Sequence, residues 1–130
     1  MTVRMFLNGQ AMRGGELHHV LGDAPFLGAV RTAPGYRFFS IGDVCPGLHP
    51  DPAVDSAIEG ELYELSLELL RDVLLPGEPR ELEFGVIKLA DGTACCSMLL
   101  SRGELERGVH REITEFGGWR DYLASIGRTA

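Results

Sequence analysis

Two strand-like segments joined by an Asp-Gly turn constrain the fold of this chain more than any other feature. Residues 84–89 and 93–100 are mostly apolar, and Ala90-Asp91-Gly92 lies between them. An Asp-Gly pair readily adopts the positive φ angles of a tight hairpin turn. The pattern therefore predicts an antiparallel hairpin, around which the chain must build a sheet.

Further strands are predicted along the N-terminal half of the chain. Residues 3–7, 26–32 and 36–41 are short apolar segments bounded by turn residues, and residues 58–65 alternate between apolar and polar. Residues 42–56 carry three prolines and are predicted to be irregular.

Helices are predicted to be few and short. Residues 16–21 fit a short helix, and Ser66 is a candidate N-cap for a second helix that ends at Pro76-Gly77. From Gly103 onward the chain is predicted to form helices and turns, and Trp119 is expected to anchor the last helix. Strands outnumber helices, so the prediction is one mixed α+β domain over residues 1–130, with a curved or barrel-like sheet and peripheral helices.

Composition excludes several classes of function. The formal net charge is −7, which argues against nucleic-acid binding because phosphate contacts need clustered cations. No apolar run approaches the roughly 20 residues of a membrane helix, and no signal pattern opens the chain, so a cytoplasmic location is expected. Three cysteines make no disulfide framework and are interpreted as small buried apolar residues, and no metal or cofactor is expected.

The first candidate site is the glycine-bearing loop that follows the first strand. Gly9 permits close approach of the backbone to a ligand, and Gln10, Ala11 and Met12 complete the loop. Successive backbone N–H groups in such a loop can bind a carboxylate or phosphate. The alternative is an ordinary turn whose glycines serve only its geometry.

The second candidate site is a group of three acids, Glu78, Glu81 and Glu83. A carboxyl group held against apolar walls has a raised pKa and can act as a general acid or base. Glu78 lies between Pro76-Gly77 and Pro79, which restrict its backbone. The alternative is that these acids belong to a solvated face.

Several motifs in order resemble a known family. The segment Phe6-Leu7-Asn8-Gly9-Gln10-Ala11-Met12-Arg13-Gly14 is similar to the Phe-x-Tyr-Gly-Thr/Ser-Leu-x-x-Gly opening of γ-glutamylcyclotransferase-like proteins. Within that superfamily, the chain more closely resembles the C-terminal domain of allophanate hydrolases. The further motifs are Arg31-Thr32-Ala33-Pro34-Gly35-Tyr36-Arg37, Pro46-Gly47-Leu48, Ala57-Ile58-Glu59-Gly60-Glu61-Leu62-Tyr63, Val86-Ile87-Lys88-Leu89-Ala90-Asp91-Gly92, and Glu112 through Phe116-Gly117-Gly118-Trp119 to Leu123.

The resemblance implies a small mixed β-barrel with a pocket beside the first loop. In cyclotransferases that loop binds the substrate carboxylate through backbone amides, and a glutamate transfers a proton as an amine attacks the γ-carbonyl. Gly9, Gln10, Ala11 and Met12 occupy the loop positions, and Glu78 is nearest the expected glutamate, with Glu81 and Glu83 as rivals. The chain departs from the pattern at two positions, where Asn8 replaces a tyrosine and Ala11 replaces a leucine or histidine.

Three hypotheses of function follow. The first is a stand-alone domain that binds a small carboxylate-bearing amide or ureido compound and catalyses its decarboxylation or rearrangement. The second is a non-catalytic accessory or oligomerisation module for a separate amidase subunit, with a homodimer as one form. The third is a γ-glutamylcyclotransferase that releases 5-oxoproline.

Overall fold

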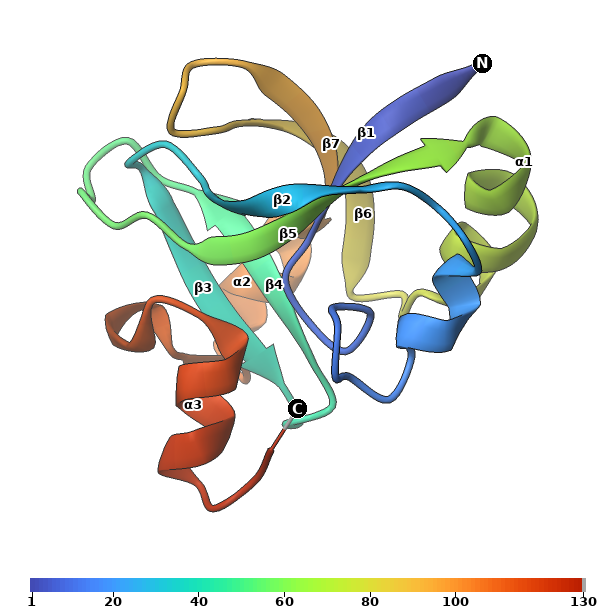
Figure 1. The fold of residues 1–130 in the computed structure, drawn as a ribbon. Coiled ribbons are helices and arrows are strands. Elements are labelled where there is room, and N and C mark those ends of the chain that lie inside the picture. The colour runs from blue at the N-terminus through green and yellow to red at the C-terminus, as the bar shows by residue number, and fades with distance from the viewer. Residues whose placement is uncertain (130) are drawn as a thin grey trace.

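The computed structural model describes residues 1–129 and is built on one mixed sheet (Figure 1). Its strands follow the order β2-β5-β1-β7-β4-β3-β8, and β6 pairs with β7 outside this path. The strands are β1 (Thr2–Leu7), β2 (Phe26–Arg31), β3 (Tyr36–Ile41), β4 (Cys45–Pro50), β5 (Glu59–Ser66), β6 (Leu82–Lys88), β7 (Ala94–Leu100) and β8 (Arg111–Glu112).

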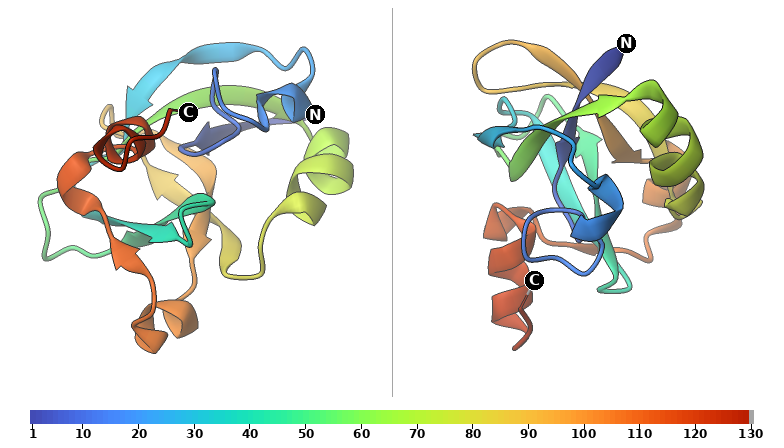
Figure 2. Two further views of the ribbon diagram at one scale, coloured as in Figure 1. Left: turned by 90° about the horizontal axis from the view of Figure 1, so that it is seen from below. Right: turned by 45° about the vertical axis from the view of Figure 1, so that its right-hand side comes forward.

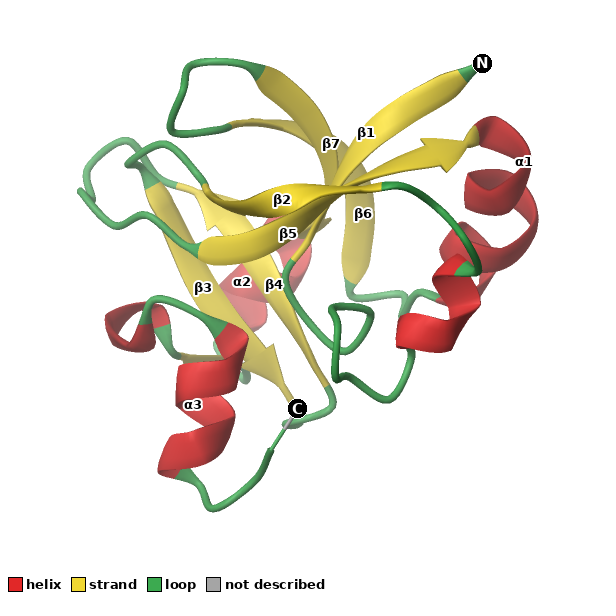
Figure 3. Cartoon of the chain, viewed as in Figure 1, coloured by secondary structure: helices red, strands yellow, loops and turns green. Residues whose placement is uncertain are grey.

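The helices are short and lie at the margins of the sheet (Figure 3). One helical segment runs from α1 (Leu67–Leu69) through a π-helical turn (Leu70–Leu74) into a 3-10 turn (Leu75–Gly77). Far from this segment, at the opposite margin of the sheet, lies α3 (Trp119–Ser125) (Figures 1 and 2). The remaining helices are α2 (Arg102–Arg107) and two 3-10 helices, His18–Leu21 and Thr114–Phe116.

The predicted hairpin is confirmed. Strands β6 and β7 pair antiparallel from Leu82↔Leu100 to Lys88↔Ala94, and Gly92 adopts the positive φ of 87° that the turn requires. The predicted N-cap is also confirmed, because the Ser66 hydroxyl accepts a hydrogen bond from the Leu69 N–H.

The prediction that residues 42–56 are irregular is wrong for β4, which pairs with β3 from Tyr36↔Pro50 to Ile41↔Cys45. Two prolines, Pro46 and Pro50, misled the prediction. The Phe38 N–H of β3 donates to the Thr114 hydroxyl and therefore points away from β4. Phe38 and its partner Leu48 are thus a non-hydrogen-bonded pair, and so are the other pairs of even-numbered residues in β3 and β4. Both prolines occupy such positions and remove no bond from the hairpin ladder.

The sheet is curved but does not close into a barrel within residues 1–129, because β2 and β8, at the two ends of the strand path, do not pair with each other. Strand β7 explains the curvature. One of its edges pairs with β6 throughout, and the other pairs in parallel with β1 at Met5↔Cys96 and with β4 at Leu48↔Leu99. Strands β1 and β4 therefore diverge from a shared edge. The mixed α+β class is confirmed.

The core fills the concave side of this sheet and includes the closing helix. Trp119, Tyr122 and Leu123 of α3 are fully buried, which confirms the predicted anchor. None of the helices within residues 1–129 is long and apolar enough to cross a membrane.

Candidate functional site

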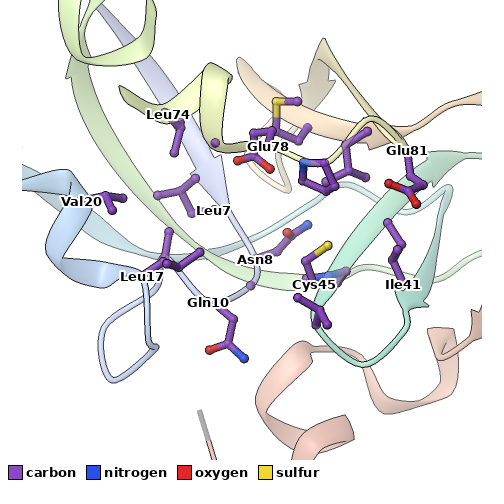
Figure 4. A pocket seen from close by; sticks show the side chains of 18 of the residues that line it. Leu7, Asn8, Gln10, Leu17, Val20, Ile41, Cys45, Leu74, Glu78 and Glu81 are labelled. Carbon is purple, nitrogen blue, oxygen red and sulfur yellow. The ribbon is translucent and has the colours of Figure 1, made fainter. Parts of the chain in front are cut away.

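A cavity of about 460 Å³ opens where β1 and β4 diverge (Figure 4). It is bounded by the loop after β1, the β3–β4 turn, the helical segment 70–77 and residues 78–82. Apolar side chains of Leu17, Val20 and Leu74 lie on one side of it, and Cys45 and Glu81 lie on the other. Among the described residues no lysine or arginine lines the cavity.

The loop after β1 is closed by its own backbone. The Met12 N–H donates to Gly9 O at 3.1 Å, and the Leu17 N–H donates to Gln10 O at 3.0 Å. Gly15 crosses close beneath Gln10, because a Cβ atom built on Gly15 would lie 2.1 Å from Gln10 O. The loop is therefore a preformed turn.

Gly9 is required for packing against the neighbouring strand. A Cβ atom built on Gly9 would lie 2.6 Å from Cδ of Pro46 in β4, closer than carbon atoms approach in proteins. The structure thus gives this glycine a packing role in addition to any role toward a ligand.

Three successive N–H groups of this loop have no acceptor. Within residues 1–129, the backbone N–H groups of Gly9, Gln10 and Ala11 donate to no protein atom, and all three residues line the cavity. Met12 differs, because its N–H is already bonded to Gly9 and its side chain is buried in the core. The predicted loop site therefore divides into three cavity residues and one core residue.

The Asn8 side chain carries an unsatisfied donor at the same place. Asn8 is 9% exposed, and its Nδ2 is buried without a hydrogen-bond partner among the described residues. Figure 4 shows its amide end pointing into the space between Glu78 and Cys45. A buried amide donor without a partner is costly, and a ligand acceptor would relieve that cost.

The three predicted glutamates lie in different surroundings. Glu78 lines the cavity, and burial raises the pKa of its carboxyl from 4.5 to about 6. Glu81 also lines the cavity. Glu83 is an exposed residue of β6 outside the cavity lining.

Cys45 is a cavity residue that sequence reasoning did not single out. Burial, assisted by the carboxyl groups of Glu78 and Glu81, raises the pKa of its thiol to about 11. The thiol is therefore protonated at neutral pH and is a weak donor rather than a nucleophile. Its place opposite Ile41 at the β3–β4 turn follows from a strand that the prolines concealed.

A buried carboxylate, Glu61, stabilises the loop after β1 through hydrogen bonds. It is 2% exposed and accepts hydrogen bonds from the Arg13 N–H at 2.8 Å, the Tyr63 hydroxyl at 2.8 Å, Arg120 at 3.1 Å and Arg13 Nε at 3.3 Å. Burial alone would raise the pKa of Glu61, but these donors outweigh it and hold the pKa below its usual value. Arg120 also donates to the Arg13 carbonyl, so Glu61 joins the loop, β5 and α3.

The cavity thus offers N–H donors at one wall, a carboxyl group with a raised pKa, and an apolar wall. Such a set can bind a carboxylate or carbonyl oxygen and move a proton beside it. Among residues 1–129, no three His, Cys, Asp or Glu side chains gather in a way that could hold a metal ion.

The sheet and the cavity beside its first loop define a γ-glutamylcyclotransferase-like fold. An AIG2-like protein from mouse has this fold, with a TM-score of 0.60 and 20% identity over 79% of this chain and 78% of that one. Residues 3–124 match the model of the allophanate hydrolase C-terminal domain, and the chain belongs to that family.

Solved structures agree with this assignment. A uropathogenic E. coli-specific protein, c4763, superposes with a TM-score of 0.87 and 35% identity, covering 95% of this chain and 97% of that one. Kluyveromyces lactis allophanate hydrolase superposes with a TM-score of 0.87 and 25% identity over 97% of this chain. The match spans only 22% of that enzyme, so this kind of domain also occurs within longer allophanate hydrolase chains. No curated protein matches the chain.

Proposed function

We propose that the cavity binds a small carboxylate-bearing amide or ureido compound and that Glu78 transfers a proton during its rearrangement. The observation that carries this proposal is that Gly9, Gln10 and Ala11, whose N–H groups have no acceptor in the described residues, line the same cavity as a carboxyl group of pKa about 6. The resemblance of residues 6–14 to the opening of γ-glutamylcyclotransferase-like proteins, in which this loop binds the substrate carboxylate, supports the proposal.

The N–H groups favour a substrate whose carboxylate serves as an anchor. With no cation in the lining, a carboxylate bound there is stabilised by backbone dipoles and by the Asn8 amide donor. These donors stabilise the negative charge, so they favour chemistry at the neighbouring amide over loss of the anchored carboxylate as neutral carbon dioxide. Rearrangement at the amide is therefore preferred to decarboxylation of the anchored group.

Glu78 suits the proton transfer because its pKa of about 6 leaves it mostly ionised at neutral pH. As an amine of the substrate attacks the amide carbonyl, the new C–N bond forms and the amine loses a proton to the Glu78 carboxylate. The old C–N bond then breaks, its electron pair stays on the departing nitrogen, and Glu78 returns the proton to that nitrogen. Glu81 lines the same cavity and is the alternative residue for this proton transfer.

Two measurements test the proposal. In a titration with N-carbamoylglycine followed by ¹⁵N NMR, the amide signals of Gly9, Gln10 and Ala11 are expected to shift more than those of other loops. Incubation with γ-glutamyl and ureido carboxylates, with products identified by NMR, is expected to show turnover that Glu78→Gln abolishes. Glu83→Gln, which changes an exposed carboxyl outside the cavity, is the matched control. Absence of amide shifts at millimolar ligand would refute the binding site.

The same assays separate the other candidate functions. Release of 5-oxoproline from the γ-glutamyl substrate would identify a cyclotransferase. The occurrence of this domain within longer allophanate hydrolase chains favours an accessory role beside an amidase as the second candidate. Co-purification with an amidase whose activity is unaffected by Glu78→Gln and Glu81→Gln would favour that role over catalysis.

A further inference from the structure

The cavity is larger and more apolar than a compact carboxylate requires. At about 460 Å³ it has the volume of about 15 water molecules, which lies within the range of small-molecule sites. The polar donors occupy only one part of it, around Asn8 and the loop after β1. A ligand as small as malonate would satisfy those donors and leave most of the apolar wall uncovered.

Exposed apolar side chains gather at the mouth of this cavity. Leu17, Val44 and Val73 are 51%, 70% and 43% exposed, and they come from three separate elements, the loop after β1, the β3–β4 turn and the helical segment 70–74. Single exposed apolar residues are common on proteins, but a cluster around one cavity indicates a binding surface.

An apolar group and a mixed group lie on different sides of the cavity. In Figure 4, Leu17, Val20 and Leu74 stand apart from Ile41, Cys45 and Glu81, with Asn8 and Glu78 between the two groups. A ligand that contacts both the donors and the apolar group therefore needs a carboxylate beside Asn8 and the loop after β1, an amide beside Glu78, and an apolar end.

We infer that the preferred ligand is an amphipathic amide: a carboxylate and an amide followed by an apolar chain of several carbons that lies on Leu17, Val20, Val73 and Leu74. This inference rests on the proposed carboxylate and amide site and specifies the substituent that the site selects. The apolar wall is adjacent to the loop donors, so one molecule can contact both.

A homologous series of N-acylglycines tests the inference by isothermal titration calorimetry. From N-acetylglycine through N-butanoylglycine to N-hexanoylglycine, affinity is expected to rise about three- to fourfold per added methylene, or about 80- to 250-fold over the four methylenes of the series. Leu17→Ser and Val73→Ser, both at exposed positions, are expected to flatten this rise, because the added methylenes lose their apolar contact. Val109→Ser is the matched control, because Val109 is also exposed and does not line the cavity.

The outcomes distinguish this inference from the proposed function. Equal binding of all three N-acylglycines would overturn the inference and leave the carboxylate and amide site intact. Failure of all three to bind would refute the proposed site itself. A flat series together with a loss of self-association in Leu17→Ser or Val73→Ser, measured by sedimentation, would assign the apolar rim to a contact between protein chains and overturn the inference.

Discussion

Removing the Glu61 carboxylate is expected to destabilise the fold by about 4 kcal/mol. In Glu61→Leu, Arg13 and Arg120 recover hydrogen bonds from water because their side chains are about half exposed. The Arg13 N–H and the buried Tyr63 hydroxyl lose their acceptor, and each unsatisfied donor costs about 1–3 kcal/mol. The sum agrees with the roughly 3–5 kcal/mol measured when one partner of a buried ion pair is removed.

Thermal unfolding provides the assay. Unfolding entropy of about 2.1 cal/mol/K per residue converts 4 kcal/mol into a fall in Tm of about 15 °C for a chain of this length. Glu61→Gln keeps an acceptor oxygen and is expected to lose about half as much. Glu59→Gln is the control, because Glu59 is half exposed in its pair with Arg31, and such surface pairs contribute about 0–1 kcal/mol.

The dependence on pH gives a second check. The folded-state pKa of Glu61 is held below its ordinary value of 4.5, so its contribution is fully present above the unfolded-state pKa and is lost as the pH falls through the folded-state pKa. The difference between wild type and Glu61→Gln should therefore shrink below about pH 4.5. A Glu61→Leu variant that melts within about 4 °C of Glu59→Gln at pH 7 would refute the idea that this carboxylate holds the loop.

Three further perturbations test the cavity itself. Burial raises the pKa of Glu78 from 4.5 to about 6, so Glu78→Gln should stabilise the protein by up to about 2 kcal/mol in urea unfolding at pH 7.5 and by only about 0.4 kcal/mol at pH 4.5. Equal effects at both pH values would contradict that pKa. Gly9→Ala should destabilise by about 1–3 kcal/mol through contact with Pro46, whereas Gly103→Ala, in a helix with open space, should be neutral or stabilising; equal melting temperatures would argue against the Gly9–Pro46 contact. Cys45 has a thiol pKa of about 11, so it should react with iodoacetamide at pH 7.5 far more slowly than free cysteine does. Reaction at the rate of free cysteine would contradict the raised pKa of this thiol.

The parts of the fold that were predictable depend on signals within a few residues of one another. The Asp91-Gly92 turn and the Ser66 N-cap are both present as expected, because turn and cap geometry are determined by neighbouring residues. Strand β4 was missed because whether Pro46 is tolerated depends on which edge of the strand its nitrogen faces. That orientation is a property of the pairing and not of the local sequence.

The candidate site was predictable only in part. The loop of Gly9, Gln10 and Ala11 and the acid Glu78 belong to one cavity, but the sequence contains no local signal for the unpartnered donor on Asn8.

Glu61 shows what kind of signal was available for a missed residue. Glu61 lies on the same face of β5 as Tyr63 and Leu65, two and four residues further along the strand, and both are buried. Its side chain therefore belongs to a covered face of the strand. Acids within an apolar strand face are expected to be paired, and Arg13 and Arg120 are those partners.

Gly9 matters both to the sequence prediction and to the packing of the structure. The sequence suggests that its missing side chain leaves space for a ligand, but in the structure Pro46 occupies the position of that side chain. The N–H groups of Gly9, Gln10 and Ala11 have no acceptors in the described residues, because the loop closes through the Gly9 and Gln10 carbonyl groups instead. Packing against β4 and closure by carbonyl groups therefore leave three successive free donors in residues that line the cavity. Three neighbouring free donors of this kind are what the proposed carboxylate site would use.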